Sequence, residues 1–408
     1  MSKELENAFK KALSGALYNA SSPQWATWSV LPTGIPALDR ALGGGFAYGT
    51  LSELFGDWGV GKTMLLYLLL AQNQKLGGTS VLFESEGAFY PEFFAALGGN
   101  PKTLLLKPIR TVEEFFDGVY KLLTVMKQAK AKGKKDVCVM GWDSLAGTGT
   151  EHLQKTWAKG EKKQDMSKAR RMSEGCALIT QMVDETNAMV VATNQLRVNI
   201  GAADWERPHT PGGKGWPFHS SQRIELNFDG GPVGSQIHYE EGEGKKVHIG
   251  RKVRGEIIKN RIAPPFRKFT MPLYTEAGYP HPLWQGEETK LGVDVEESTW
   301  NWISDPRSTF AVRNEEGTVV GRKRFCTSSG SRWNFAEEIT AFMAATGDTP
   351  PSFFKKDFKQ ILPSVPQILM AHYDPSRLCA KCFQFTPPPE DTICDPCKTN
   401  PKRGEKKK

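Results

Sequence analysis

FGDWGVGKTMLL, residues 55 to 66, is the stretch that decides the fold of this 408-residue chain. Its core, Gly56 to Thr63, fits the pattern G-x-x-x-x-G-K-[ST] of a phosphate-binding loop between a strand and a helix. The apolar residues Leu51 to Phe55 suit a buried strand, and Met64 to Leu70 suit a helix. In such a loop the backbone N–H groups and the positive end of the helix attract a polyphosphate. The motif therefore predicts nucleotide binding, with a Gly-rich turn that binds nothing as the alternative.

The residues of this loop have distinct expected roles toward ATP and Mg²⁺. Lys62 would reach the terminal phosphates, and Thr63 would offer its hydroxyl to Mg²⁺. Asp143 ends the apolar stretch DVCVMGWD, where a carboxylate can hold Mg²⁺ through water; its alternative role is that of a helix cap. The expected nucleotide-binding loop consists of Gly56, Asp57, Trp58, Gly59, Val60, Gly61, Lys62 and Thr63.

Hydrolysis of ATP needs a further carboxylate that orients the attacking water. Glu84 and Glu86 both lie at the end of the strand-like stretch SVLFE, residues 80–84. Spacing alone does not choose between the two.

Composition describes a globular protein with a basic balance. Hydrophobic residues make up 39% of the chain and charged residues 24%, which is typical of globular proteins. The formal net charge of +8 favours polyanionic partners. The charged N-terminus has no signal-peptide pattern, and the apolar run MLLYLLLA is too short to cross a bilayer. Cys138, Cys176 and Cys326 are scattered, which suits a reducing compartment, so we expect a cytoplasmic protein.

Apolar strands alternate with helical stretches up to about residue 285. This alternation predicts the α/β class, with a mostly parallel sheet that carries helices on both faces. After residue 285 the sequence is rich in Trp and turns, with NFAEEITAFMA (334–344) as its one clear helix. Near the N-terminus, Leu5, Phe9, Leu13 and Leu17 recur at four-residue steps, which predicts a short amphipathic helix. Besides the strand before the phosphate loop, the expected strands are residues 80–84, 103–109, 136–142, 188–194 and 221–227.

These patterns divide the chain into four regions. Residues 1–32 hold the N-terminal helix and a strand, 33–285 the nucleotide-binding core, 286–370 a small α+β domain, and 371–408 a Cys-containing segment with a Lys-rich tail. Two C-x-x-C pairs in the last region predict a Cys₄ zinc ribbon with a structural Zn²⁺, although their spacer is shorter than usual. Disulfides are the alternative. The four predicted ligands are Cys379, Cys382, Cys394 and Cys397.

Two long polar segments follow strands at the edge of the sheet where open α/β folds bind their ligands. Gly147 to Arg171 is rich in Lys and Arg and contains Trp157, and Asn199 to Trp216 is rich in Gly. We expect both to lack secondary structure, and long loops of that kind are functional or disordered. Basic charge with glycines and aromatic residues suits single-stranded nucleic acid; the alternative is a solvated charged face.

Several motifs together resemble the RecA family of recombinases, in the same order and at similar spacings from residue 33 to about residue 270. They are TGIPALDRALGGG with GDWGVGKT, then ESEGAFYPEF, DSLAG, TNQLRVNIG with TPGGKG, and IIKNRIAPPFRK. The resemblance implies a RecA-like P-loop NTPase core and a DNA-dependent ATPase that uses ATP and Mg²⁺. It also implies a helical filament of identical subunits, in which the N-terminal helix docks on the neighbouring subunit. Without the resemblance, packing of this helix on its own core would be the favoured interpretation.

The resemblance implies roles for single residues as well. Glu86 would be the carboxylate that activates water, and Phe93 the aromatic residue stacked on adenine. Gln195 would sense the γ-phosphate and pass its state to the following loop; from its position alone it can also be a capping or sheet-edge amide. The two polar segments would be DNA-binding loops, with contacts from Arg170, Arg171, Arg197, Gly212 and Gly213.

Lys259 and Arg261 are two residues apart, so on a strand their side chains project from one face. An ordinary solvated charged face is one interpretation of this pair. The resemblance implies another, in which the two cations cross a subunit boundary and touch the γ-phosphate bound by the neighbour, as arginine fingers do in trans. Hydrolysis would then require assembly.

The chain also departs from the family pattern. Gly141 and Trp142 precede Asp143, and the phosphate loop contains Asp57 and Trp58. The zinc ribbon and the basic tail KTNPKRGEKKK are further departures, and they suggest extra contact with nucleic acid.

These observations together predict an ATP-dependent recombinase. We expect it to form filaments on single-stranded DNA, pair that DNA with a homologous duplex and exchange strands in recombination and repair. One alternative is a ring-forming helicase or branch-migration ATPase with the same core fold. The other is a nucleotide-gated DNA-binding mediator without strand exchange.

Overall fold

The computed structural model describes most of the chain between residues 29 and 305 and several short parts beyond it. Val30–Tyr373 forms one compact unit. The expected N-terminal helix, the four C-terminal cysteines and the basic tail lie outside the described residues. The described residues are 29–134, 136–160, 167–197, 210–241, 244–282, 286–305, 309–313, 319–329, 332–336, 339, 352–355 and 358.

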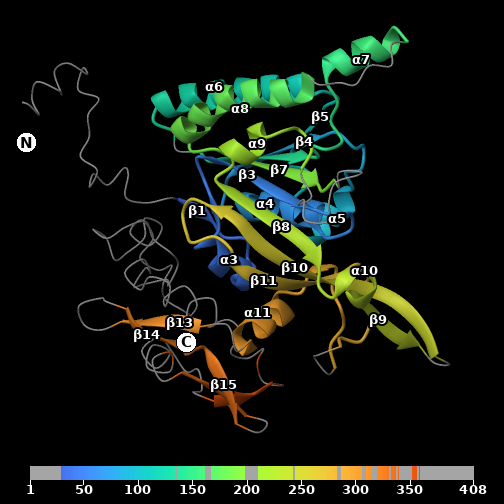
Figure 1. Cartoon of the computed structure of the whole chain (residues 1–408), viewed down its shortest axis with the longest axis vertical. Coiled ribbons are helices and arrows are strands. Elements are labelled where there is room, and N and C mark those ends of the chain that lie inside the picture. The colour runs from blue at the N-terminus through green and yellow to red at the C-terminus, as the bar shows by residue number, and fades with distance from the viewer. Residues whose placement is uncertain are drawn as a thin grey trace, which may run out of the picture. The chain divides into compact units, whose positions relative to one another are not determined.

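A ten-stranded sheet organises this unit, in the order β12-β11-β10-β8-β3-β7-β6-β4-β5, with β9 paired to β10 (Figure 1). The strands from β8 to β5 in this order are parallel to one another, which confirms the predicted parallel core. Their carboxyl ends therefore meet at one edge of the sheet. These strands are β3 (Thr50–Gly56), β4 (Thr79–Glu84), β5 (Leu105–Pro108), β6 (Cys138–Asp143), β7 (Met189–Gln195) and β8 (Gln222–Phe228).

Side chains of the parallel strands alternate between two hydrophobic cores, one on each face of the sheet. On β4, Leu82 enters one core, whereas Val81 and Phe83 enter the other. The first core is completed by α3 (Pro36–Leu42), α4 (Lys62–Lys75) and α5 (Pro91–Ala96). The second is completed by α6 (Val112–Ala131), α8 (Ser167–Thr186) and α9 (Gly215–His219), of which α6 and α8 lie side by side in Figure 1. None of the helices in the described part of the chain is both long and apolar enough to span a bilayer.

Beyond β8 the sheet continues with antiparallel strands. The long strand β10 (Lys245–Asn260) pairs with β8, β9 (Gln236–Glu241) and β11 (Lys268–Tyr274), and β12 (Gly292–Val293) pairs with β11. A short helix, α10 (Gly231–Gly234), connects β8 to β9. A separate two-stranded sheet is formed by β1 (Val30–Leu31) and β2 (Phe46–Ala47).

Helix α11 (Val295–Ser304), which follows β12, is not among the elements predicted from the sequence. Asp294 caps it by accepting the backbone N–H of Glu297 at 2.7 Å. Two carboxylate oxygens hold the helix on the sheet. Asp294 Oδ2 contacts His281 Nε2 at 2.5 Å, and Glu297 Oε2 accepts the Tyr274 hydroxyl at 3.2 Å.

The helix predicted over residues 334–344 is wrong at its start. Asn334 and Phe335 belong to a strand and pair with Thr327 and Cys326, because Phe335 and Cys326 are both buried there and burial overrides local helix propensity. Most of the remaining residues of that segment lie outside the described part. The small strands of this region are β13 (Thr309–Arg313), β14 (Val319–Arg324), β15 (Cys326–Ser329), β16 (Arg332–Phe335) and β17 (Ser352–Phe354).

The sequence led us to expect a loop without secondary structure in the first polar segment, Gly147 to Arg171. This expectation is wrong. It contains α7 (Glu151–Ala158) and the start of α8. Thr150 caps α7 by accepting the N–H of Leu153 at 3.0 Å, and Lys155 pairs with Glu151 at 3.0 Å. Capping and an i,i+4 ion pair thus stabilise a helix in a segment of polar composition.

Candidate functional site

The phosphate loop runs from the end of β3 into the first turn of α4. Gly61, just before α4, has a φ of 83°, a left-handed conformation that favours glycine. The Lys62 ammonium donates to the carbonyl oxygens of Gly56 at 3.2 Å and Asp57 at 2.6 Å, so it lies over the loop. Burial lowers the pKa of Lys62, and nearby carboxylates, Asp143 foremost, oppose that shift. The ammonium is therefore positioned to exchange two neutral carbonyl partners for phosphate oxygens.

Asp143 lies at the carboxyl end of β6, next to the start of α4. Its carboxylate accepts a hydrogen bond from Thr193 Oγ1 at 2.5 Å and another from the Thr63 hydroxyl. Burial raises the pKa of Asp143, whereas these two hydrogen bonds lower it. The structure thus brings together the hydroxyl and the carboxylate from which the sequence predicted a Mg²⁺ site. Hard oxygen donors beside a phosphate loop fit this ion, which when bound would neutralise phosphate charge.

The two candidate carboxylates after β4 have different surroundings. Glu84 is buried, and its carboxylate accepts the backbone N–H groups of Glu86 at 2.9 Å, Gly87 at 2.8 Å and Ala88 at 3.1 Å. Glu86 is exposed, and Ser144 donates its hydroxyl to the Glu86 carboxylate. Glu84 therefore shapes the turn, and the turn presents Glu86 to solvent beside Asp143.

Gln195 ends β7 directly beside the phosphate loop. The parallel register pairs Gln195 with Gly56, and the N–H of Leu196 donates to the Gly56 carbonyl at 3.2 Å. That carbonyl also accepts the Lys62 ammonium. One peptide group therefore contacts both the loop lysine and the residue that follows Gln195. The side chain of Gln195 itself is exposed.

Phe93 belongs to an aromatic cluster of α4 and α5. Its ring centroid lies 6.2 Å from that of Tyr67, and the rings of Phe89 and Phe94 each lie 5.7 Å from Tyr67. Phe93 is half-buried, whereas Phe94 is fully buried. The cluster therefore fixes Phe93 and leaves part of its ring accessible.

Trp142, which departs from the family pattern, is a core residue. Its indole is fully buried, stacks on Phe115 with ring centroids 3.7 Å apart and donates to Thr148 Oγ1 at 2.9 Å. The preceding Gly141 faces the opposite core, where an added Cβ would lie 3.1 Å from Leu66 of α4. A small residue and a large one therefore fill the two faces of β6 just before Asp143.

Trp58, the departure within the phosphate loop, points outward. It is 68% exposed, its ring lies edge-on to Phe228 at 6.4 Å, and the Arg251 guanidinium lies 5.6 Å from its centroid. The neighbouring Asp57 accepts the Trp58 backbone N–H at 2.8 Å. An aromatic and cationic group therefore flanks the outer side of the loop.

Lys259 and Arg261 lie at the end of β10, next to α9. Lys259 donates to the carbonyl oxygens of Pro217 at 3.0 Å and Phe218 at 2.7 Å, and Arg261 donates to Phe218 at 3.4 Å. Burial lowers the pKa of Lys259 to about 8, together with the cations of Arg261 and Arg223. The predicted pair is thus a cationic cluster that caps the end of α9.

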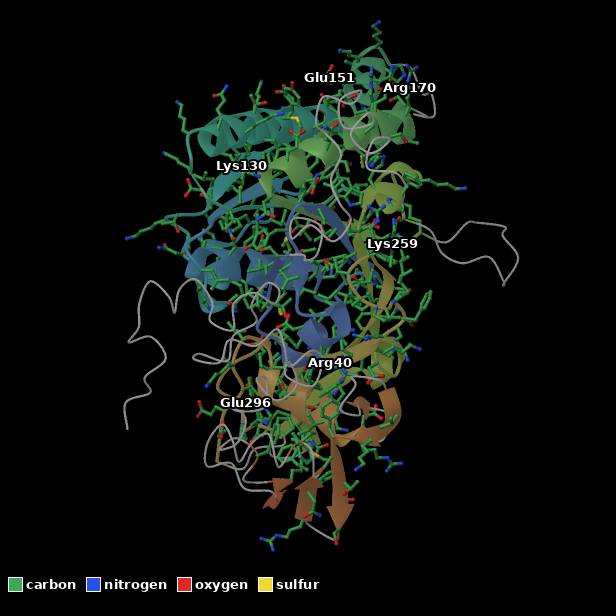
Figure 2. The ribbon with its side chains drawn as sticks, turned by 90° about the vertical axis from the view of Figure 1, so that its left-hand side faces the viewer. Arg40, Lys130, Glu151, Arg170, Lys259 and Glu296 are labelled. Atoms are coloured by element: carbon green, nitrogen blue, oxygen red, sulfur yellow. The ribbon has the colours of Figure 1, made fainter. Side chains whose placement is uncertain are left out.

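This pair lies away from the phosphate loop of its own chain. Lys259 pairs with Arg223, and Arg223 pairs with Glu53, which precedes Gly56 by three residues on β3. Strand spacings put the Lys259 backbone about 14 Å from Gly56. Figure 2 shows Lys259 below Arg170 and above Arg40. Within one chain, therefore, β10 directs Lys259 and Arg261 to α9, not to the loop.

The predicted DNA contacts Arg170 and Arg171 lie on the first turns of α8, where both are exposed. Arg170 pairs with Glu174 at 2.7 Å; Arg171 pairs with Glu174 at 3.1 Å and with Glu113 at 3.6 Å. Exposed ion pairs of this kind contribute little to stability, so a phosphate can replace the carboxylate. Arg197 is exposed just after β7.

Gly212 and Gly213 lie in the described part of the second polar segment; residues 198–209 are outside it. Their φ values are 97° and 74°. A Cβ would lie 2.8 Å from Leu145 at Gly212 and 2.7 Å from Ala169 at Gly213. Glycine is therefore required here by conformation and by close packing, on Leu145 at Gly212 and on α8 at Gly213.

The cysteines predicted to bind zinc lie outside the described residues. The other three, Cys138, Cys176 and Cys326, are buried free thiols. In the described part of the chain, one group of three possible metal ligands comes together, His281 with Asp294 and Glu297, within 4.8 Å. The hydrogen bonds that fix α11 account for that group.

Several polar residues that support the site were not predicted from the sequence. Thr193 and Ser144 hold Asp143 and Glu86, and Glu53 bonds to Asn194 and Arg223. The available signal was a polar residue inside an apolar strand, as in TLSELFG and MVVATNQ. Such a residue needs a partner when it is buried.

Comparison with known proteins agrees with this geometry. The family described as RecA N-terminal domain matches residues 2–279. Protein RecA of Thermus aquaticus is 30% identical over 329 residues, which cover 79% of this chain and 90% of that protein. Protein RecA of Thermus thermophilus is 29% identical over 327 residues, with the same coverage of 79% and 90%. Protein RecA of Borrelia duttonii is 31% identical over 249 residues, or 61% of this chain and 63% of that protein. A match of this extent, on a parallel sheet with a phosphate loop at its carboxyl edge, shows that the chain belongs to the RecA family.

Proposed function

We propose that this protein is an ATP-dependent recombinase that forms filaments on single-stranded DNA and promotes homologous pairing and strand exchange in the cytoplasm. Lys62, Thr63 and Asp143 would bind ATP with Mg²⁺, and Glu86 would activate the attacking water. The observation that carries the proposal is the pairing of Gln195 with Gly56. It supports a direct route from the phosphates to the segment that follows β7.

Gln195 would couple the nucleotide to DNA. Its exposed side chain begins beside the phosphate loop, and the chain continues from it through Arg197 into the second polar segment. A γ-phosphate that attracts the Gln195 amide would therefore shift the start of this segment. The proposed DNA contacts, which follow the backbone phosphates without reading sequence, are Arg170, Arg171, Arg197, Gly212 and Gly213.

Lys259 and Arg261 would act on the nucleotide of a neighbouring subunit. Their distance from the loop of their own chain supports a role in trans, as does their clustering, because a polyphosphate would relieve the mutual repulsion of the cations. Hydrolysis would then depend on assembly, in agreement with the proposed filament.

We further propose a structural Zn²⁺ in the C-terminal segment. Four thiolates leave no open coordination position, so this ion would stabilise the segment without taking part in hydrolysis. Removing the segment from Asp374 onward should reduce the salt dependence of DNA binding if the basic tail contacts phosphates. An unchanged salt slope would exclude that contact. The proposed ligands are Cys379, Cys382, Cys394 and Cys397.

The test combines DNA-stimulated ATP hydrolysis, strand exchange and electron microscopy with ATP and single-stranded DNA. Lys62→Ala should abolish exchange, and Glu86→Gln should leave filaments that persist because they do not hydrolyse ATP. Rings in place of filaments would favour a helicase or branch-migration ATPase. DNA binding without DNA-stimulated hydrolysis and without exchange would favour a mediator. A protein that stays monomeric and ignores DNA at saturating ATP would contradict the whole proposal.

A further inference from the structure

Glu53 is a buried carboxylate that neither ATP binding nor hydrolysis, as proposed above, requires. It lies in the interior of β3 and is 0% exposed. Arg223 Nε donates to its Oε2 at 2.5 Å, and Asn194 Nδ2 donates to its Oε1 at 2.8 Å. An ionised carboxylate is costly to bury unless it is paired and hydrogen-bonded, so these two contacts allow it to remain here.

The strand register places Glu53 between charged residues on β8 and β10, on one side of β3, and Asn194 on β7, on the other side. Arg223 of β8 pairs with Glu53, and Lys259 of β10 pairs with Arg223, so three charged residues form one row across neighbouring strands. On the other side, Asn194 of β7 stands immediately before Gln195. Glu53 therefore lies between the strand that carries the proposed trans cations and the strand that carries the proposed phosphate sensor.

Asn194 shares its amide between Glu53 and the second polar segment. Its Nδ2 donates both to Glu53 and to the Pro211 carbonyl, the latter at 3.2 Å. Its Oδ1 accepts the backbone N–H of Gln195 at 3.0 Å. Pro211 directly precedes Gly212, one of the proposed DNA contacts. A single buried side chain thus links the carboxylate, the sensor and the segment.

The two bonds of this amide differ in strength. The bond to Glu53 is shorter and has a charged acceptor, whereas the bond to Pro211 is longer and has a neutral acceptor. If Gln195 moves toward a γ-phosphate and draws Asn194 with it, the bond to Pro211 yields first. The Glu53 charge decides which contact is kept.

We propose that Glu53 is a positioning residue that holds Asn194 and Arg223 and thereby couples the nucleotide at the phosphate loop to the second DNA-binding segment. The inference rests on the proposed function. The competing interpretation is a purely structural pair of Glu53 and Arg223 that stabilises the sheet. A structural pair would affect unfolding but not the response to DNA.

The test replaces Glu53 by glutamine, which keeps the shape and removes the charge. Glu225→Gln on β8 is the matched control, because Glu225 is half-buried and lies outside this network. For Glu53→Gln we expect basal hydrolysis without DNA and KM for ATP to stay within about twofold of wild type. DNA-stimulated kcat should fall at least about fivefold, the lower end of typical coupling between sites. Glu225→Gln should keep the full stimulation.

A second variant covers the case in which Glu53→Gln does not fold. Asn194→Ser removes the shared amide, leaves the Glu53–Arg223 ion pair and should show the same loss of stimulation. Full stimulation in either folded variant overturns the proposal for Glu53. Failure of the wild type to respond to DNA would instead contradict the proposed function, so the two failures are distinguishable.

Discussion

Replacing Glu84 and Glu86 one at a time by glutamine separates a structural carboxylate from a chemical one. The N–H groups of Glu86 and Ala88 both contact Glu84 Oε1, and the N–H of Gly87 contacts Oε2. In Glu84→Gln the amide oxygen can keep the first two partners. The new NH₂ group then faces the N–H of Gly87, an exposed turn residue, so that this partly buried donor loses its acceptor.

The two substitutions should have opposite signatures. Losing the hydrogen bond of the partly buried Gly87 N–H should lower the free energy of unfolding of Glu84→Gln by about 1 kcal/mol. In Glu86→Gln the exposed side chain should leave that free energy within about 0.5 kcal/mol of wild type. Its amide can still accept from Ser144 but is no longer a base, so DNA-stimulated hydrolysis should fall by a factor of about 10²–10⁴.

Urea unfolding, phosphate release with single-stranded DNA and binding of a fluorescent ATP analogue measure the three quantities. We expect Glu84→Gln to lose stability and retain most of its hydrolysis, and Glu86→Gln to bind ATP with unchanged stability and almost no turnover. The reverse pattern, a stable but inactive Glu84→Gln beside an active Glu86→Gln, would refute the assignment.

Three further predictions follow from burial and charge. Because the pKa of Lys259 is about 8, its charge is lost as pH rises; charge-dependent assembly should weaken about three- to tenfold between pH 7 and pH 9, allowing for solvent screening. Light scattering should show this loss in wild type but not in Lys259→Arg, and an equal loss in both would exclude Lys259 as the cause. Trp142→Ala should reduce the free energy of unfolding by about 3–5 kcal/mol, whereas Trp157→Ala, at a side chain that is 75% exposed, should change it by about 0.5 kcal/mol or less; equal effects in urea would contradict the core role of Trp142. Glu174→Gln should raise affinity for single-stranded DNA about two- to fivefold by releasing Arg170 and leaving Arg171 with Glu113 as its remaining carboxylate partner, and anisotropy that shows no gain would argue against DNA contact there.

The parallel core was predictable because its strands are buried on both faces and therefore read as apolar runs. The phosphate-loop motif then predicts nucleotide binding at the end of one of these strands, β3. Helix α11 had a usable signal as well, since Asp294 and Glu297 have the spacing of a capping pair. It was missed because the Trp-rich sequence around it obscured the apolar period. Helix α7 was not predicted because its composition is polar and gives no apolar period. The structure shows that a cap at Thr150 stabilises its first turn.

The sequence could not show which of Glu84 and Glu86 is buried and which is exposed. Both residues follow the same strand, and they differ only in how the turn after β4 folds back. The backbone N–H groups of the turn point at Glu84, and that contact buries one carboxylate while it exposes the other. Spacing carries no information on which carboxylate a turn will enclose.

The distance of Lys259 from the phosphate loop could not be predicted from the sequence, for a different reason. The sequence places it on a strand, but its distance from the phosphate loop depends on strand order, in which β8 lies between β3 and β10. Strand order is set by pairings between segments far apart in the chain. Two cations that a linear motif assigns to a phosphate can therefore belong to another subunit's phosphate.

The charges around Lys259 explain why a contact between Lys259 and the phosphate of a neighbouring subunit would make assembly depend on ATP. Burial lowers the pKa of Lys259 most, Arg261 and Arg223 lower it further, and Glu53 raises it. The pKa of His219 is lowered by burial and then by Arg261 and Lys259, so the histidine adds no further positive charge at neutral pH. An isolated subunit thus carries clustered positive charge opposed chiefly by one buried carboxylate. A neighbour that presents the γ-phosphate of ATP would relieve this repulsion and one that presents ADP would relieve less of it, so the same electrostatics that destabilise the free surface would make the filament sensitive to the nucleotide.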